Sequence, residues 1–128
     1  MKIYKYNEAV KKSKEQEEFD IFIEMIINKF YPDGDLENMG SYECEIKYLG
    51  SRNYIRSSFY FMVIEEEELK IMQNVVEYFR TFDPTVNMFI RKYKDQMVEC
   101  CVDIRISTAY SEIYKDLKRN EDSKKYNL

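Results

Sequence analysis

The segment Met97–Ile106 shows the clearest alternation of apolar and polar side chains along the chain. Side chains of a β-strand point alternately to the two faces of a sheet. A strand buried on both faces would be apolar throughout, so this pattern predicts a strand with one apolar and one polar face. The apolar positions are Val98, Cys100, Val102, Ile104 and Ile106, and the polar face carries Glu99, Cys101, Asp103 and Arg105.

The pattern along the rest of the chain predicts three further strands, Tyr42–Leu49, Tyr54–Ile64 and Val86–Tyr93. Short turns at Gly50–Asn53 and Lys94–Gln96 join the four strands into two successive hairpins. We therefore expect two ββ units in the chain.

Apolar side chains at helical spacing predict three helices around these hairpins. The first helix is expected over Asn7–Tyr31 and the second over Glu65–Phe82. The third is short and follows Ser107 or Thr108, either of which can act as its N-cap. The polar residues 120–128 are expected to form a frayed tail.

The resulting order, α-ββ-α-ββ-α, predicts an α+β fold in a single domain of residues 1–128. We expect a four-stranded, mostly antiparallel sheet with the helices packed mainly on one face. The pattern leaves the strand order open. In its topology the chain resembles the compact α/β domains of bacterial secretion chaperones. This resemblance implies a small acidic protein that dimerises and binds other chains.

The polar positions of the four predicted strands form one face with no net charge, because four acids stand beside four bases. Tyr and Arg are enriched in protein interfaces, so this face is the candidate protein-binding site. The alternatives are an ordinary solvated face, or a face that the first helix covers. The candidate binding residues are Tyr54, Arg56, Tyr60, Phe89, Arg91, Tyr93, Glu99, Asp103 and Arg105.

Composition narrows the chemistry that the chain can perform. The absence of His removes the usual nucleophile–base pairs and His-containing zinc sites. With three Gly, the chain has no glycine-rich phosphate loop. Asp33–Asp35 is interpreted as a turn, since its Gly lies too early for a calcium loop. We expect no catalytic residue, no metal site and no cofactor.

The three cysteines are an odd number, and no secretion signal or membrane-spanning segment is expected. This pattern predicts free thiols in a cytoplasmic protein. Cys44 and Cys100 fall on predicted apolar faces, whereas Cys101 falls on the polar face and is expected to be exposed. A net charge of −4 without a clustered basic face argues against a nucleic-acid partner.

The leading hypothesis is a small non-enzymatic protein that binds another protein through the polar sheet face. An immunity protein, an inhibitor or a secretion chaperone would fit this hypothesis. One alternative is a ligand-binding domain or an enzyme that uses carboxylates or Tyr. The other is a homo-oligomeric structural module, for example a homodimer.

Overall fold

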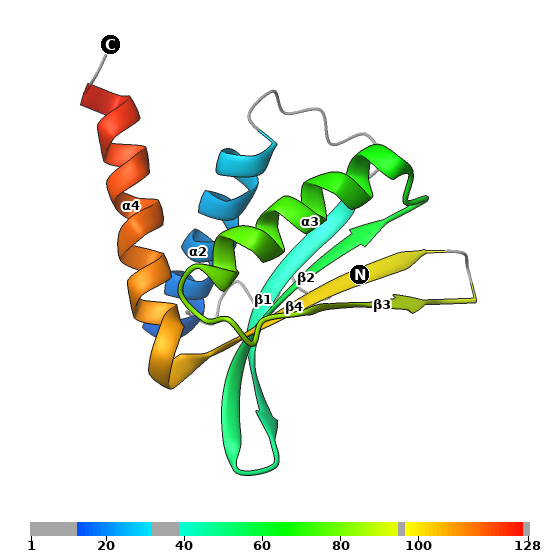
Figure 1. The fold of residues 1–128 in the computed structure, drawn as a ribbon, viewed down its shortest axis with the longest axis horizontal. Helices are drawn as coiled ribbons and strands as arrows, with labels where there is room; N and C mark the ends of the chain where they lie inside the picture. The colour runs from blue at the N-terminus through cyan, green and yellow to red at the C-terminus, as the bar shows by residue number, and fades with distance from the viewer. Residues whose placement is uncertain (1–12, 32–38, 95–96, 127–128) are drawn as a thin grey trace.

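The computed structural model describes residues 13–31, 39–94 and 97–126 (Figure 1). The expected start of the first helix at Asn7 and the turn at Asp33–Asp35 lie outside these residues, as does most of the turn Lys94–Gln96. In chain order the elements are α2 (Lys14–Phe30), β1 (Met39–Leu49), β2 (Arg52–Phe61), α3 (Glu66–Arg80), β3 (Met88–Lys92), β4 (Val98–Arg105), the π-helical turn η1 (Ile106–Tyr110) and α4 (Ser111–Tyr126).

The four strands form one sheet in the order β1-β2-β4-β3, and every neighbouring pair is antiparallel. Each hairpin pairs consecutive strands, and the pairing of β2 with β4 joins the two hairpins. The strands β2 and β3 therefore run parallel on either side of β4, and α3 connects them. The predicted α+β class, the element order and the antiparallel sheet are confirmed.

The helices pack together on one side of the sheet, as Figure 1 shows for α2, α3 and α4. The core lies between them and the apolar sheet face, where Phe59 and Cys100 are fully buried. Phe22 of α2 is also fully buried in this core. The helix α2 thus covers the apolar face, and the polar face is not its packing surface.

Local sequence explains where the first two described helices begin. Ser13 caps α2, because its side-chain oxygen accepts a 3.1 Å hydrogen bond from the Gln16 N–H. Glu65 and Glu68 form a reciprocal capping box at α3, in which the Glu65 N–H donates to Glu68 over 2.9 Å. The acidic first turn of α3 also complements the positive end of the helix dipole.

The last helix corrects two predictions. Ser107 and Thr108 are not N-caps, because both lie inside the π-helical turn that continues directly into α4. The expected tail from Asn120 is helical as far as Tyr126. A tertiary contact explains this extension in part, since Asn28 of α2 donates a 3.1 Å hydrogen bond to Glu121.

The strand bounds differ from the predicted ones by a few residues at several ends. The β1–β2 hairpin is tighter than expected, since Leu49 already pairs with Arg52. Gly50 in this turn has a φ of +66°, a left-handed conformation that side chains disfavour. Within the part of the chain that the structure describes, no helix combines the length and the apolar character needed to cross a membrane.

Candidate functional site

The sheet register brings the predicted polar positions together on the side away from α2, α3 and α4. We call this surface the polar face. It contains all nine predicted binding residues and, besides them, Glu43, Glu45, Lys47, Ser58 and Cys101. Cross-strand neighbours on it include Arg56 beside Asp103, Tyr60 beside Glu99, Tyr54 beside Arg105, and Arg91 beside Glu99.

Arg56 and Asp103 form a two-pronged ion pair near the middle of the polar face. The Nε–Oδ1 and Nη2–Oδ2 distances are 2.8 and 2.9 Å. The guanidinium carbon of Arg56 also lies 4.8 Å from the centre of the Phe89 ring. Only 6% of Arg56 is exposed. The carboxylate of Asp103 compensates its buried charge.

Glu99 is buried as well, with 3% of its surface exposed. The Tyr93 hydroxyl donates to its Oε1, and the Cys101 thiol lies 3.1 Å from its Oε2. Burial by itself would raise the pKa of Glu99, but hydrogen bonding by Tyr93, Cys101, Ser58 and Tyr60 outweighs it and lowers the pKa. Glu99 is therefore a carboxylate held in its charged form by donors of the protein itself.

Cys101 is fully buried, which corrects the expectation of an exposed thiol. It lies between β2 and β3, opposite Ser58 and Phe89. Burial, and then its hydrogen bond to Glu99, raise the pKa of Cys101 to about 11. The thiol is thus protonated at neutral pH and is a poor nucleophile. Cys44 and Cys100 are buried and free, as expected.

One exposed part of the polar face lies along β3. Phe89 is 36% exposed and Tyr93 is 43% exposed, and Arg91 is exposed beside them. The Arg91 guanidinium lies 4.0 Å from Glu99 and 5.3 Å from the centre of the Phe89 ring. The buried carboxylate of Glu99 therefore positions both Arg91 and Tyr93.

A cavity of about 390 Å³ opens at the end of the polar face where β4 ends. Within the described residues, the buried Nε of Arg105 has no hydrogen-bond partner. The wall of this cavity combines aromatic, hydroxyl, amide and charged side chains. The lining residues are Tyr54, Thr85, Asn87, Phe89, Asp103 and Arg105.

Sequence reasoning missed the part that Thr85 plays in this cavity. The signal was the turn before β3, where Asp83 accepts hydrogen bonds from the Thr85 N–H (3.1 Å) and hydroxyl (2.6 Å). These hydrogen bonds and electrostatic attraction by Arg105 lower the pKa of Asp83, although burial, the largest single influence, acts to raise it. The turn places Thr85 and Asn87 beside the cavity.

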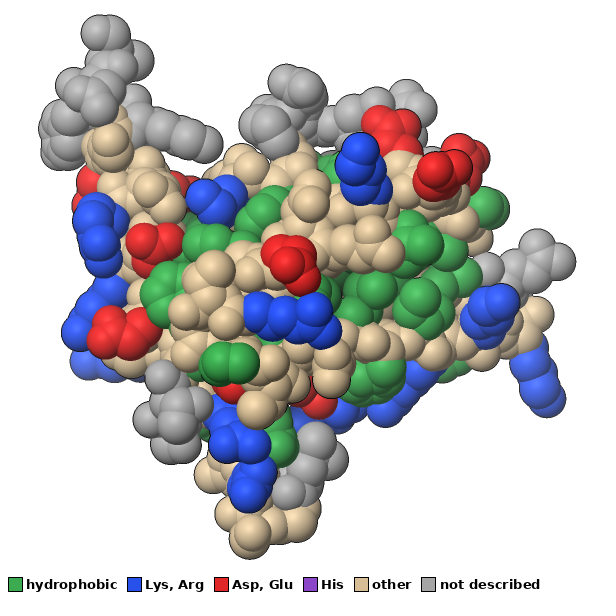
Figure 2. Space-filling view, in the orientation of Figure 1, with side chains coloured by type: hydrophobic (Ala, Val, Ile, Leu, Met, Phe, Trp, Pro, Cys, Tyr) green, Lys and Arg blue, Asp and Glu red, His purple; other side chains and the backbone are tan. Residues whose placement is uncertain are grey.

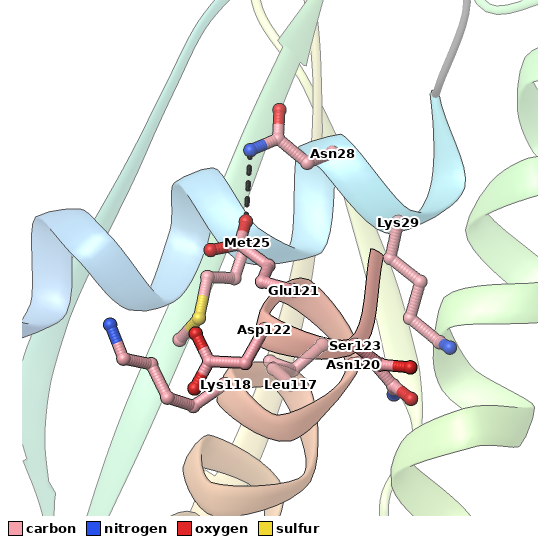
Figure 3. Close-up of a pocket in the computed structure, with 9 residues that line it drawn as sticks. All are labelled: Met25, Asn28, Lys29, Leu117, Lys118, Asn120, Glu121, Asp122 and Ser123. Carbon is pink, nitrogen blue, oxygen red and sulfur yellow. Dashed lines mark hydrogen bonds between the residues drawn. The ribbon is translucent and has the colours of Figure 1, made fainter. Parts of the chain in front are cut away.

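A larger cavity of about 580 Å³ lies between α2 and α4, outside the polar face. Figure 3 shows that α4 supplies most of its lining and that Asn28 reaches across to Glu121. None of the predicted binding residues lines it. Lys29, Lys118 and Asp122 line it at separate points, as Figure 3 shows, and do not converge on a reacting centre.

Over the described residues, no three His, Cys, Asp or Glu side chains gather in a way that could hold a metal ion. The fold and the site together describe an α+β protein with a helix layer on one side of the sheet and an ordered polar face on the other. Comparisons with family models, curated proteins and solved structures found no match to this chain.

Proposed function

We propose that this chain is a non-enzymatic protein that acts by binding another protein through the polar face. One observation carries the proposal: the buried carboxylate of Glu99 contacts exposed Tyr93 and Arg91, and the Arg91 guanidinium lies over the ring of exposed Phe89. Aromatic and Arg side chains supply most of the energy in many interfaces. Side chains that are already ordered lose little entropy on binding, which favours affinity.

The partner is expected to present a carboxylate to Arg105. Arg56 forms a close ion pair with Asp103, and Arg91 lies 4.0 Å from Glu99. The Arg105 guanidinium attracts Asp83, but its buried Nε has no hydrogen-bond partner in the described part of the chain. The adjoining cavity offers the Phe89 ring and the Asn87 amide beside this guanidinium. An acidic side chain flanked by an apolar group fits these features, because Arg binds carboxylates with directed hydrogen bonds.

Binding of this kind acts by steric blocking or by holding the partner, as an inhibitor, an immunity protein or a secretion chaperone does. The cytoplasm is the compartment we propose, since Cys44, Cys100 and Cys101 are all free thiols. The enzyme alternative has less support. Glu99, the buried carboxylate of the polar face, already binds donors of its own chain, and the Cys101 thiol has a raised pKa.

The first experiment identifies the partner by photo-crosslinking in the native cell. Phe89 is replaced by p-benzoylphenylalanine, which keeps an aromatic ring on the polar face. Ile21 of α2, which is 43% exposed on the helix side, carries the same probe as a control. We expect a protein other than this chain to be crosslinked from position 89 and not from position 21. Equal crosslinking from both positions, or a product containing only copies of this chain, would contradict the proposal.

The second experiment measures the affinity of the purified partner by calorimetry. Arg105→Met keeps the aliphatic stem and removes the charge, and it also removes a buried N–H without a hydrogen-bond partner among the described residues. We expect binding to weaken at least tenfold while the thermal midpoint changes little. Arg119→Met on α4, whose side chain is 70% exposed, is the matched control and should bind normally. Unchanged affinity of Arg105→Met would overturn the assignment of the carboxylate site.

A further inference from the structure

The strand β3 forms one edge of the sheet and pairs only with β4 among the described strands. Just beyond β3, the Tyr93 N–H donates a 2.9 Å hydrogen bond to the carbonyl oxygen of Met97. The backbone N–H and C=O groups of Tyr93 therefore point toward β4. Backbone groups alternate along a strand, so Phe89 and Arg91 also direct theirs toward β4. The N–H and C=O groups that point outward belong to Met88, Ile90 and Lys92.

The two edges of the sheet differ in their protection. Beside β1 lies α2, from which the Gln16 side chain donates a 3.4 Å hydrogen bond to the Cys44 carbonyl. On β3, in contrast, Ile90 is 41% exposed on the helix side and Phe89 is 36% exposed on the polar side. Figure 2 shows hydrophobic side chains gathered beside α3, over the β3–β4 side of the sheet. An edge strand with exposed apolar residues is a template for pairing with another strand.

We propose that β3 pairs antiparallel with β3 of a second copy of this chain, about a two-fold axis at Ile90. The two four-stranded sheets then form one continuous sheet. Ile90 is the middle residue of Met88–Lys92, so this register alone pairs every residue of the strand. This register also fits the hydrogen-bonding pattern of an antiparallel pair. The N–H and C=O groups of Ile90 point outward, so each can bond to the corresponding group of Ile90 in the second copy.

The side chains are complementary in this register. Ile90 lies opposite the partner subunit's Ile90, and Met88 lies opposite the partner subunit's Lys92. Phe89 lies opposite the partner subunit's Arg91 in a non-hydrogen-bonded pair, where side chains are closest. A guanidinium already lies over the Phe89 ring within one chain, at 5.3 Å, so a second cation–π contact is compatible with this geometry. No like charges oppose each other, whereas a two-fold axis at Arg91 would set two guanidinium groups against each other.

The dimer goes beyond the proposed function. It does not depend on that function, because the dimer forms through the edge of β3 and the proposed binding uses the polar face. Residues directly opposite each other in a sheet point to the same face. The two polar faces would therefore lie on the same side of the joined sheet. A different protein that contacts both polar faces at once would bind more tightly than one that contacts a single face.

Paired charge variants test this register by sedimentation. The unmodified chain is expected to show a concentration-dependent dimer of twice its mass. Ile90→Lys and Ile90→Glu each set like charges opposite one another and should be monomeric alone, whereas an equimolar mixture should recover the dimer mass. Ile21→Lys, a substitution at a similarly exposed isoleucine on α2, should remain dimeric. An unmodified chain that is monomeric at all concentrations overturns the proposal, and so does an Ile90→Lys variant that still dimerises.

Amide exchange measured by nuclear magnetic resonance provides a second readout that does not depend on mass. In the dimer, the outward amides of Ile90 and Lys92 should exchange slowly, and Ile90→Lys should make the Lys92 amide exchange fast. The amides of Phe89 and Arg91 face β4 and should stay protected in both proteins, which also shows that the variant is folded. Fast exchange at Ile90 in the concentrated unmodified chain would exclude the β3 pairing. Partner crosslinking from position 89 would be unaffected by that result, so the two proposals fail separately.

Discussion

Glu99 shows how the polar face is ordered at the scale of single residues. Its carboxylate accepts hydrogen bonds from Tyr93 and Cys101 and attracts Arg91 from the exposed side. A buried charge of this kind is costly unless donors surround it, and here the donors come from β2, β4 and the residue after β3. The exposed aromatic and basic groups are thus anchored by a group that solvent does not reach.

Glu99→Gln is expected to lower the free energy of unfolding by about 1–3 kcal/mol at pH 7, because it removes hydrogen bonds to a charged group. The pKa of Glu99 is lowered from 4.5 in the folded protein, so its contribution is present above pH 4.5 and is lost as the pH falls. Urea titrations at several pH values should show the difference between the variant and the unmodified chain shrinking in acid.

Glu45→Gln is the matched control for this titration. Glu45 lies on the same face and pairs with Lys47 at 3.2 Å, but its side chain is 41% exposed. An exposed pair contributes little, so the free energy of unfolding should change by less than about 1 kcal/mol. Equal effects of the two substitutions would show that Glu99 does not organise the face.

At the scale of elements, the polar face depends on how the short segment after α3 leads into β3. Arg80, at the end of α3, donates to the Val86 carbonyl over 2.7 Å and to the Asn87 side chain over 2.6 Å. A third donation goes to Glu77 over 3.1 Å, so one planar guanidinium joins the helix end to the start of the strand. The position of β3 is thus coupled to α3 through a side chain.

Arg80→Lys should loosen this connection, because an ammonium group cannot reproduce the three directed hydrogen bonds of a guanidinium. We expect amide exchange at Phe89 and Arg91 to accelerate about fivefold, equivalent to roughly 1 kcal/mol of local stability. The β1–β2 hairpin should change little. Arg119→Lys on α4 is the control substitution, and the same acceleration in that variant would argue against a specific role of Arg80.

At the scale of the whole molecule, one aromatic cluster holds the helix layer together. Phe22 of α2 has ring-centre distances of 6.2 Å to Phe79 of α3, 4.9 Å to Tyr110 of η1 and 6.3 Å to Tyr114 of α4. Segments far apart in the sequence therefore meet at a single buried ring. The helices act as one layer that supports the sheet from its apolar side.

Phe22→Ala should lower the free energy of unfolding by about 3–5 kcal/mol, because it leaves a cavity where three helical segments meet. Urea denaturation followed by circular dichroism measures this loss. Ile21→Ala is the control: its position is adjacent but 43% exposed, and it should cost about 0.5 kcal/mol or less. Similar costs for the two substitutions would contradict the role of Phe22 in joining the helices.

The sequence by itself determined the number of strands, their grouping into hairpins and the side chains that share a face. These properties follow from the local alternation of a strand backbone, as the correct placement of Arg56 and Asp103 on one face illustrates. It also determined the α+β class, because helical spacing separates the hairpins. End positions such as Ser107 were predicted wrongly, because a π-helical turn arises from packing and has no capping signal.

Only the tertiary structure decided the strand order, the face that the helices cover and the burial of Glu99 and Cys101. Burial on the polar face depends on which strands become neighbours, and neighbours are chosen by long-range pairing. Cys101 lies between Ser58 of β2 and Phe89 of β3, a placement that no local pattern contains. The same strand order leaves β3 at the edge with Ile90 exposed, which is the physical basis of the proposed dimer.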